Sequence, residues 1–274
     1  MKPSFPTLPR RALLLAAAAA VLAGCATPTA APPNPALAQP IRLVTSGGFA
    51  EAHQQLFPLF EKQTGGKVES AYGSSMGAST TSIPNRLQRG EPIDVVVLER
   101  GALDKLVAQG QVRPGSEVDL VRSSIGLAVR AGAPVPDIST EAKFKQVLLA
   151  APSIAYSASA SGTFYETKML KQLGIEAQVL PKSKKVVGDR VGTIVARGDA
   201  VVGMQQVSEL LPIPGITFVG RLPDSVQSYA VFSAGIATGA KNPEGARELL
   251  RFYQSAAARP VVEKTGLEVI APKP

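Results

Sequence analysis

The sequence predicts an α/β fold, and three observations support this prediction. Short apolar segments alternate with longer segments whose apolar residues recur at helical spacing. Residues 94–98 (DVVVL) form a β-branched run, which is typical of a strand buried on both faces of a sheet. Three of the predicted strands lead through a loop rich in Ser and Gly into a helix. Units of this kind favour a sheet covered by helices.

Each predicted strand is a short apolar run bounded by polar or Gly-containing turns. In chain order, strands are expected at residues 41–45, 67–71, 94–98, 123–130, 153–156, 200–204 and 228–237. The helix after the first strand places Phe49, Leu56 and Phe60 on one apolar face. His53 lies off that face, so we expect it to be exposed rather than catalytic.

The later helices are recognised by their boundaries, which are a Gly after the last turn or an Asn-Pro-Glu start. They are expected up to about residue 89, at 101–109, up to about 173, at 190–197, at 242–255 and near 258–265.

Composition excludes several kinds of site. The 274 residues include one Cys and one His, which excludes a disulfide framework, an iron–sulfur cluster, a Cys-based zinc site and a multi-His metal centre. There is no Trp, and aromatic residues make up 5% of the chain, which disfavours sugar and single-stranded nucleic-acid sites. We identify neither paired glycosidase carboxylates nor a Ser–His–Asp arrangement around His53. We therefore expect no metal and no cofactor.

The charge of the chain favours a small anionic partner. Lys2, Arg10 and Arg11 precede Cys25 and no acidic residue does, so loss of that segment lowers the formal net charge from +8 to +5. No run of Lys or Arg resembles a nucleic-acid patch, so we expect no nucleic-acid partner. A modest positive excess fits an anionic small molecule or an anionic surface.

The N-terminus has the features of an export signal. Residues 12–23 form an apolar run of twelve, which is too short to span a bilayer and suits a signal-peptide core. The run ends in Leu-Ala-Gly-Cys, which resembles a bacterial lipobox, so we expect a lipoprotein signal peptide at 1–25 with acylation of Cys25. Residues 26–40 are rich in Pro and Ala and predict an extended linker. The folded part should begin near Ile41, outside the cytoplasm.

The three Ser/Gly loops predict an anion site. They are residues 46–48, 72–79 and 157–162. Loops at the carboxyl ends of parallel strands meet at one edge of a sheet, where ligands bind. Each following helix offers unpaired N–H groups, and Ser hydroxyls add donors. The alternative for each Ser is an ordinary helix cap.

The ordered set of motifs resembles a known family. Ser46, the loop 72–79, the run 91–98 and the segment 241–244 are similar to the periplasmic molybdate-binding-type (class II) solute-binding proteins of ABC transporters. The resemblance covers roughly residues 41–270. It implies a two-lobed periplasmic binding protein type 2 fold with a ligand cleft between the lobes. Lobe 1 would be 41–122 plus 229–270, and lobe 2 would be 123–228. It also implies a monomer that delivers an oxyanion to a transporter permease.

Together, the resemblance and the three Ser/Gly loops indicate which residues contact the ligand. Ser46 and Ser75 fall where the family binds its oxyanion, and Ala158 or Ser159 falls near a third contact. The family's strand ending in Ser-Ala ends here in Glu99-Arg100, and an arginine there favours a carboxylate ligand, with an ion pair to Asp104 as the alternative. The candidate ligand-binding residues are Ser46, Gly47, Ser74, Ser75, Arg100, Ser159, Ser161, Gly162 and Gln205.

A second resemblance indicates an enzyme as the alternative function. Bacterial aconitate isomerases resemble the same family, and the segments 46–49 and 156–162 look compatible with them. Their reaction moves a proton between carbons of an unsaturated tricarboxylate and needs a base but no cofactor. Tyr72 and Tyr156, which lie at the loops, are the candidate proton carriers. The leading expectation is anion capture for a transporter, and the isomerase is the alternative.

Overall fold

The computed structural model describes residues 34–270 together with Met1. Apart from Met1, the predicted signal peptide 1–25 with its Cys25 lies outside the described residues, as do residues 26–33 of the predicted linker. The remaining part of that linker is not extended, because Pro35–Leu37 form a 3₁₀ helix, η1. Leu37 packs against the apolar core, and the Asn242 side chain donates to the carbonyls of Ala36 and Gln39 at 3.0 and 2.9 Å. A short 3₁₀ helix therefore precedes Ile41, near which the folded part is expected to begin.

The strands form one mixed sheet in the order β2-β1-β3-β9-β4-β7-β5-β6, with β8 and β10 also paired to β4. They are β1 Ile41–Thr45, β2 Val68–Tyr72, β3 Val95–Glu99, β4 Val118–Arg130, β5 Ile154–Ser157, β6 Ser183–Val186, β7 Val202–Gln206, β8 Ile216–Arg221, β9 Tyr229–Ile236 and β10 Glu268–Val269. β1 is parallel to β2 and β3, and β5 is parallel to β6 and β7. The predicted strands are all present, and apart from the start of β4 their limits lie within two residues of expectation.

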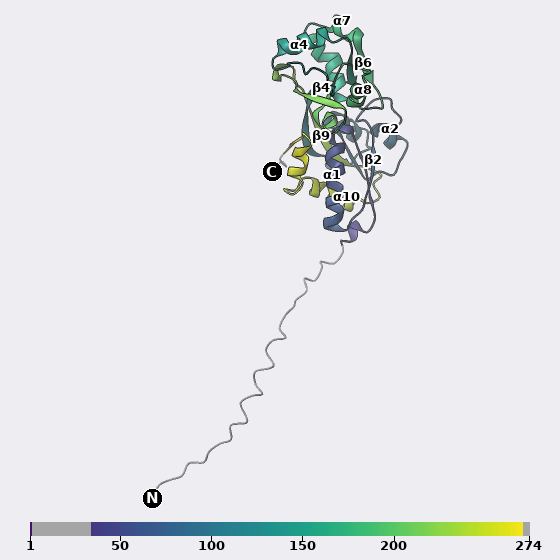
Figure 1. Ribbon diagram of the computed structural model, residues 1–274. Helices are drawn as coiled ribbons and strands as arrows, with labels where there is room; N and C mark the ends of the chain where they lie inside the picture. Colours follow the sequence, from purple (N-terminus) through teal and green to yellow (C-terminus); the bar gives the residue numbers. More distant parts are fainter. Residues whose placement is uncertain (2–33, 271–274) are drawn as a thin grey trace. The chain divides into compact units, whose positions relative to one another are not determined.

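The long strand β4 connects two parts of this sheet. Its residues 118–124 pair with β9, whereas residues 125–130 pair with β7 and β8. The sequence predicted only the second half of this strand. In Figure 1, α1 and α10 lie along one part of the sheet, whereas α4, α7 and α8 gather around the other.

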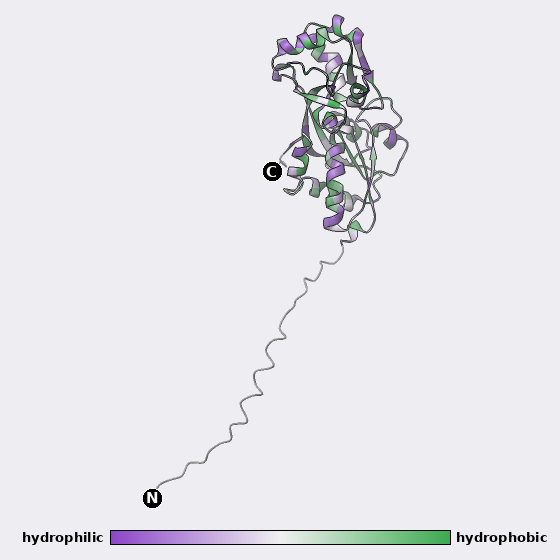
Figure 2. Cartoon of the chain, in the orientation of Figure 1, coloured by the Kyte–Doolittle hydropathy of each residue, from purple (hydrophilic) through white to green (hydrophobic). Residues whose placement is uncertain are grey.

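The helices cover the sheet. They are α1 Gly47–Thr64, α2 Ile83–Gln88, α3 Arg100–Ala108, α4 Glu141–Ala150, α5 Ala160–Phe164, the π-helical turn η2 Tyr165–Met169, α6 Leu170–Gln172, α7 Glu176–Val179, α8 Val191–Arg197, α9 Val207–Leu210, α10 Pro243–Tyr253 and α11 Arg259–Lys264, with 3₁₀ turns η3 Leu180–Lys182 and η4 Asp224–Val226. The helix predicted to end near residue 173 is present as α5, η2 and α6 in succession. In Figure 2 the hydrophilic colour gathers on the helices, whereas the central strands are mostly hydrophobic.

The buried apolar residues form four clusters, which we group in pairs as a first core and a second core. The first core takes residues from 41–121 and 230–267, and the second core takes residues from 125–226. The predicted stripe of α1 lies in the first core, with Phe49, Leu56 and Phe60 almost fully buried. The strand β3 is buried at its first four positions, as its β-branched run predicted.

His53 contradicts the expectation of an exposed side chain. It is fully buried, its Nδ1 lies 2.5 Å from the Tyr253 hydroxyl, and its Nε2 lies 2.6 Å from Ser70 Oγ. The reason is that α1 packs against β2 as well as against the C-terminal helices, so residues beside the apolar stripe are also covered. Burial lowers the pKa of His53 to about 4, so the imidazole is neutral at pH 7.

Candidate functional site

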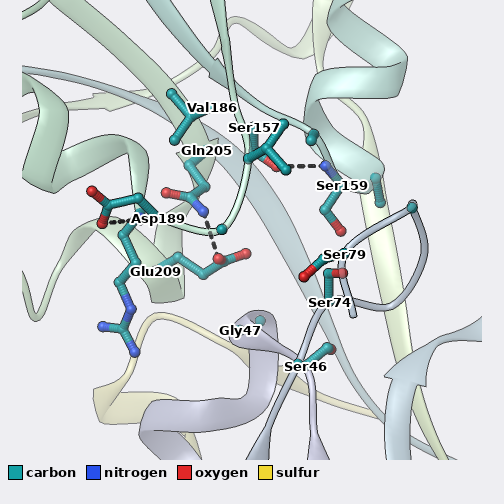
Figure 3. Close-up of a pocket in the computed structure, with 18 of the residues that line it drawn as sticks. Ser46, Gly47, Ser74, Ser79, Ser157, Ser159, Val186, Asp189, Gln205 and Glu209 are labelled. Atoms are coloured by element: carbon teal, nitrogen blue, oxygen red, sulfur yellow. Dashed lines mark hydrogen bonds between the residues drawn. The ribbon is translucent and has the colours of Figure 1, made fainter. Parts of the chain in front are cut away.

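A cavity of about 750 Å³ lies where residues of the first core meet residues of the second. Its wall takes residues from all three predicted Ser/Gly loops, from the segment 185–193, and from the end of β7 with α9. The predicted convergence of the three loops is therefore observed in the fold. Figure 3 shows the side chains of these loops facing one another across the cavity.

The structure brings together most of the candidate site residues. Those that line the cavity are Ser46, Gly47, Tyr72, Ser74, Ser159, Ser161 and Gln205. Those that do not are Ser75, Arg100, Tyr156 and Gly162.

Two of the lining serines present hydroxyls without a partner. Ser46 precedes α1 and is 2% exposed, yet its side chain makes no capping hydrogen bond. Ser161, in α5, is 4% exposed. Neither Oγ atom has a hydrogen-bond partner within the described part of the chain. A buried hydroxyl left unpaired costs roughly 1–3 kcal/mol, so a ligand whose oxygens pair with these hydroxyls would gain stabilisation from both cores.

Three candidates are held in structural roles instead. The Oγ of Ser75 is buried and accepts a hydrogen bond from the backbone N–H of Glu99 at 3.0 Å. A Cβ on Gly162 would lie 1.5 Å from the carbonyl oxygen of Ser157, so glycine is needed for α5 to approach β5. Tyr156 is 4% exposed and packs in the second core with its ring 4.8 Å from that of Tyr165. Contrary to the prediction, none of these three residues lines the cavity.

Arg100 is also placed elsewhere. Its Nε lies 2.8 Å from Asp104 Oδ1 and its Nη1 lies 2.8 Å from Asp119 Oδ1. The alternative of an ion pair to Asp104 is therefore confirmed. The side chain turns this way because Arg100 opens α3, which places Asp104 one helical turn along the same face.

The sequence reasoning missed a carboxyl group of the site, that of Glu209. Glu209 lies in α9, four residues after Gln205, and lines the cavity. Gln205 Nε2 donates to Glu209 Oε2 at 2.6 Å, while Gln205 Oε1 accepts from the Val191 N–H at 2.9 Å. A Cβ on Gly47 would lie 2.5 Å from Glu209 Oε2, so the carboxyl group abuts the start of α1. An acidic residue just after the end of a buried strand was the available signal.

The electrostatics of the cavity centre on Glu209 and Arg190. Burial raises the pKa of Glu209 to about 7, against the opposing effects of the Arg190 charge and the Gln205 hydrogen bond. Lys185 pairs with Glu166 at 2.5 Å, and Asp189 pairs with Arg197 at 3.4 Å. Within residues 34–270, Arg190 makes no ion pair closer than 4.0 Å. Its guanidinium is thus available to an anion in the cavity.

A family model described as bacterial extracellular solute-binding protein matches residues 41–268. The chain belongs to this family. Aconitate isomerase from a Pseudomonas species is 42% identical to this solute-binding protein over 277 residues, which covers 100% of both chains. The solved periplasmic molybdate-binding protein of Azotobacter vinelandii is 20% identical, with a TM-score of 0.68 over 85% of this chain and 100% of that one. PEB3 of Campylobacter jejuni with L-phospholactate bound is 13% identical, with a TM-score of 0.63 over 83% of this chain and 99% of that one.

These similarities confirm the family resemblance and the predicted two-lobed α/β fold. The family description also supports the expected location of the folded part outside the cytoplasm. Across residues 34–270, no helix combines the length and the hydropathy that a membrane span requires.

Proposed function

We propose that this solute-binding protein is an aconitate isomerase that binds its substrate in the cavity between the two cores. The observation that carries the proposal is the 42% identity to aconitate isomerase along the whole of both chains. The three relatives named above carry aconitate, molybdate and L-phospholactate in their names, and all three are anions. The cavity volume of about 750 Å³ lies in the range of small-molecule sites.

The cavity offers donors for the three carboxylates of aconitate. Arg190 can grip one carboxylate through two parallel hydrogen bonds. The unpartnered hydroxyl of Ser46 and the first N–H groups of α1, an 18-residue helix, suit a second. Ser159 and Ser161 approach from the other core and suit a third. An anion that touches both cores favours closure of the lobes over it.

The proposed reaction rearranges one molecule without any other reactant. A proton leaves the methylene carbon, the double bond shifts by one carbon, and a proton returns to the carbon at the far end. The negative charge that develops in between spreads onto the carboxylates, where Arg190 and the hydroxyls stabilise it.

A proton NMR time course of trans-aconitate with the purified protein tests this proposal. We expect signals of cis-aconitate to appear at a rate proportional to the protein concentration. Heat-denatured protein at the same concentration serves as the control for uncatalysed change. An unchanged spectrum at stoichiometric protein would refute the isomerase proposal.

The second candidate is capture of a small anion for an ABC transporter, by a monomer that docks on a permease. The family match and the full coverage of a periplasmic molybdate-binding protein favour it. Titration calorimetry with molybdate and with trans-aconitate separates the two candidates. Tight binding of either anion without turnover would support the transporter role.

We make two further proposals about the chain, which concern the boundaries of its lobes and a lipid anchor. We propose lobe 1 at 41–122 plus 229–270 and lobe 2 at 123–228, because β4 changes its partners between residues 124 and 125. We also propose a lipid anchor at Cys25, on the strength of the sequence Leu-Ala-Gly-Cys. Labelled palmitate should enter the protein in cells and be absent from Cys25→Ser.

A further inference from the structure

We propose that Glu209 is the catalytic residue that removes the proton from aconitate and returns it at the far carbon. This inference rests on the proposed isomerase function and adds the base that the sequence did not identify. It replaces Tyr156, which packs in the second core, and Tyr72, which lies at the cavity with 40% of its surface exposed.

The position of Glu209 is determined by contacts on two sides. Ser208, the residue before it, is buried and donates from its hydroxyl to the carbonyl of Gly48 at 2.8 Å. This bond ties α9 to the first turn of α1. Glu209 Oε2 therefore lies beside Gly47, at the helix start where we propose that a substrate carboxylate binds.

Gln205 is a positioning residue for this carboxyl group. It is 3% exposed, and its carbonyl oxygen is occupied by the N–H of Val191. The amide cannot turn over without losing that bond, so its NH₂ group always faces Glu209. Gln205 thus holds Oε2, and Oε1 makes no hydrogen bond with any residue that the structure describes. In Figure 3 the carboxyl group of Glu209 projects into the cavity opposite Ser46, Ser74 and Ser79.

The other carboxyl group of the cavity wall is less suited to the role. Asp189 pairs with Arg197 and also accepts the backbone N–H of Arg190 at 2.8 Å. Its side chain is 41% exposed, which keeps it in contact with water. Glu209, by contrast, is surrounded by protein, which raises its pKa, and among the described residues Arg190 is the one cation whose charge lowers that pKa.

The protonation of Glu209 suits a group that must both accept and donate. With a pKa of about 7, both forms are populated at neutral pH. The carboxylate takes a proton from the methylene carbon, and the electrons of the broken C–H bond form the new double bond. The electrons of the old double bond move to the far carbon, which then takes the proton from the carboxylic acid. Glu209 ends in the state in which it began.

The test compares wild type with Glu209→Gln in D₂O, using NMR to follow both isomerisation and deuterium uptake into aconitate. We expect the variant to lose both by about 10²–10⁴-fold, the usual contribution of a general base. Glu263→Gln, an exposed change on α11, is the matched control and should keep the wild-type rate. Calorimetry should show that Glu209→Gln still binds trans-aconitate within a few-fold of wild type.

Each outcome has a distinct meaning. A wild-type rate retained within tenfold in Glu209→Gln would overturn the assignment while leaving the isomerase function standing. A wild type that neither isomerises nor exchanges would overturn both.

A second variant tests the positioning role through pH. Gln205→Met keeps the size of the side chain but removes the hydrogen bond to Glu209, so the acid limb of kcat/KM should move to higher pH. An unmoved limb would refute that role for Gln205.

Discussion

The raised pKa of Glu209 predicts how the free energy of unfolding depends on pH. The ordinary pKa of a Glu side chain is 4.5, and burial raises that of Glu209 to about 7. The folded protein therefore holds this proton at pH values where the unfolded chain has released it. By linkage, the contribution of Glu209 to the free energy of unfolding falls as the pH rises through this window. From pH 5 to pH 8 the loss amounts to about 2–3 kcal/mol.

His53 acts in the opposite direction over part of the same window. Burial lowers its pKa from 6.5 to about 4, so the unfolded chain binds a proton that the folded protein refuses. The stability that comes from a neutral His53 therefore increases as the pH rises from about 4 to 6.5. Between pH 5 and 6.5 the two groups oppose each other in wild type, and their contributions to the pH dependence largely cancel.

The variant Glu209→Gln separates the two effects. Urea unfolding at pH 5, 6, 7 and 8 measures the free energy for the variant and for wild type. We expect the variant to gain relative to wild type by about 2–3 kcal/mol between pH 5 and pH 8. Its own stability should rise from pH 5 to 6.5, because His53 is then unopposed. A difference between variant and wild type that stays constant with pH would refute the reasoning.

Three further substitutions test structural roles that the fold gives to single residues. Gly162→Ala should lower the free energy of unfolding by about 2–3 kcal/mol, because its Cβ would meet the Ser157 carbonyl oxygen; urea unfolding measures the loss, and an unchanged midpoint would contradict the close approach. Asn242→Ala removes the cap of α10 and two hydrogen bonds to the η1 region, and should cost about 1–2 kcal/mol in the same assay. Arg100→Met should cost at most about 1 kcal/mol and leave the affinity for trans-aconitate unchanged in calorimetry; a weakened affinity would return Arg100 to the site.

Local sequence patterns predicted the strands and helices whose signals lie within a short stretch of the chain. The strands β1, β3 and β9 and the helices α1 and α10 follow from apolar runs, helical spacing and end signals. The strands β6, β8 and β10 were not predicted. β8 (ITFVGR) does carry an apolar, β-branched run, which the sequence analysis overlooked. By contrast, β6 (SKKV) is polar and β10 (EV) is only two residues long, and both are strands because β5 or β4 supplies their hydrogen bonds. Pairing with a distant strand leaves no mark in a short window of sequence.

The same distinction applies to the features of the site, some of which follow from the sequence and others only from the tertiary structure. The sequence alone determined that three Ser/Gly loops follow strands, that the chain lacks the residues for a metal centre built on Cys or on several His, and that its excess charge is positive. Each of these depends on composition or on order along the chain. Only the tertiary structure decided which polar side chains face the cavity. Ser46 and Ser75 look alike as serines in loops, yet one hydroxyl is unpartnered and the other is bonded to the Glu99 N–H. Glu209 reaches Gly47 because α9 packs on α1 across more than 150 residues of chain, a contact that no local pattern encodes.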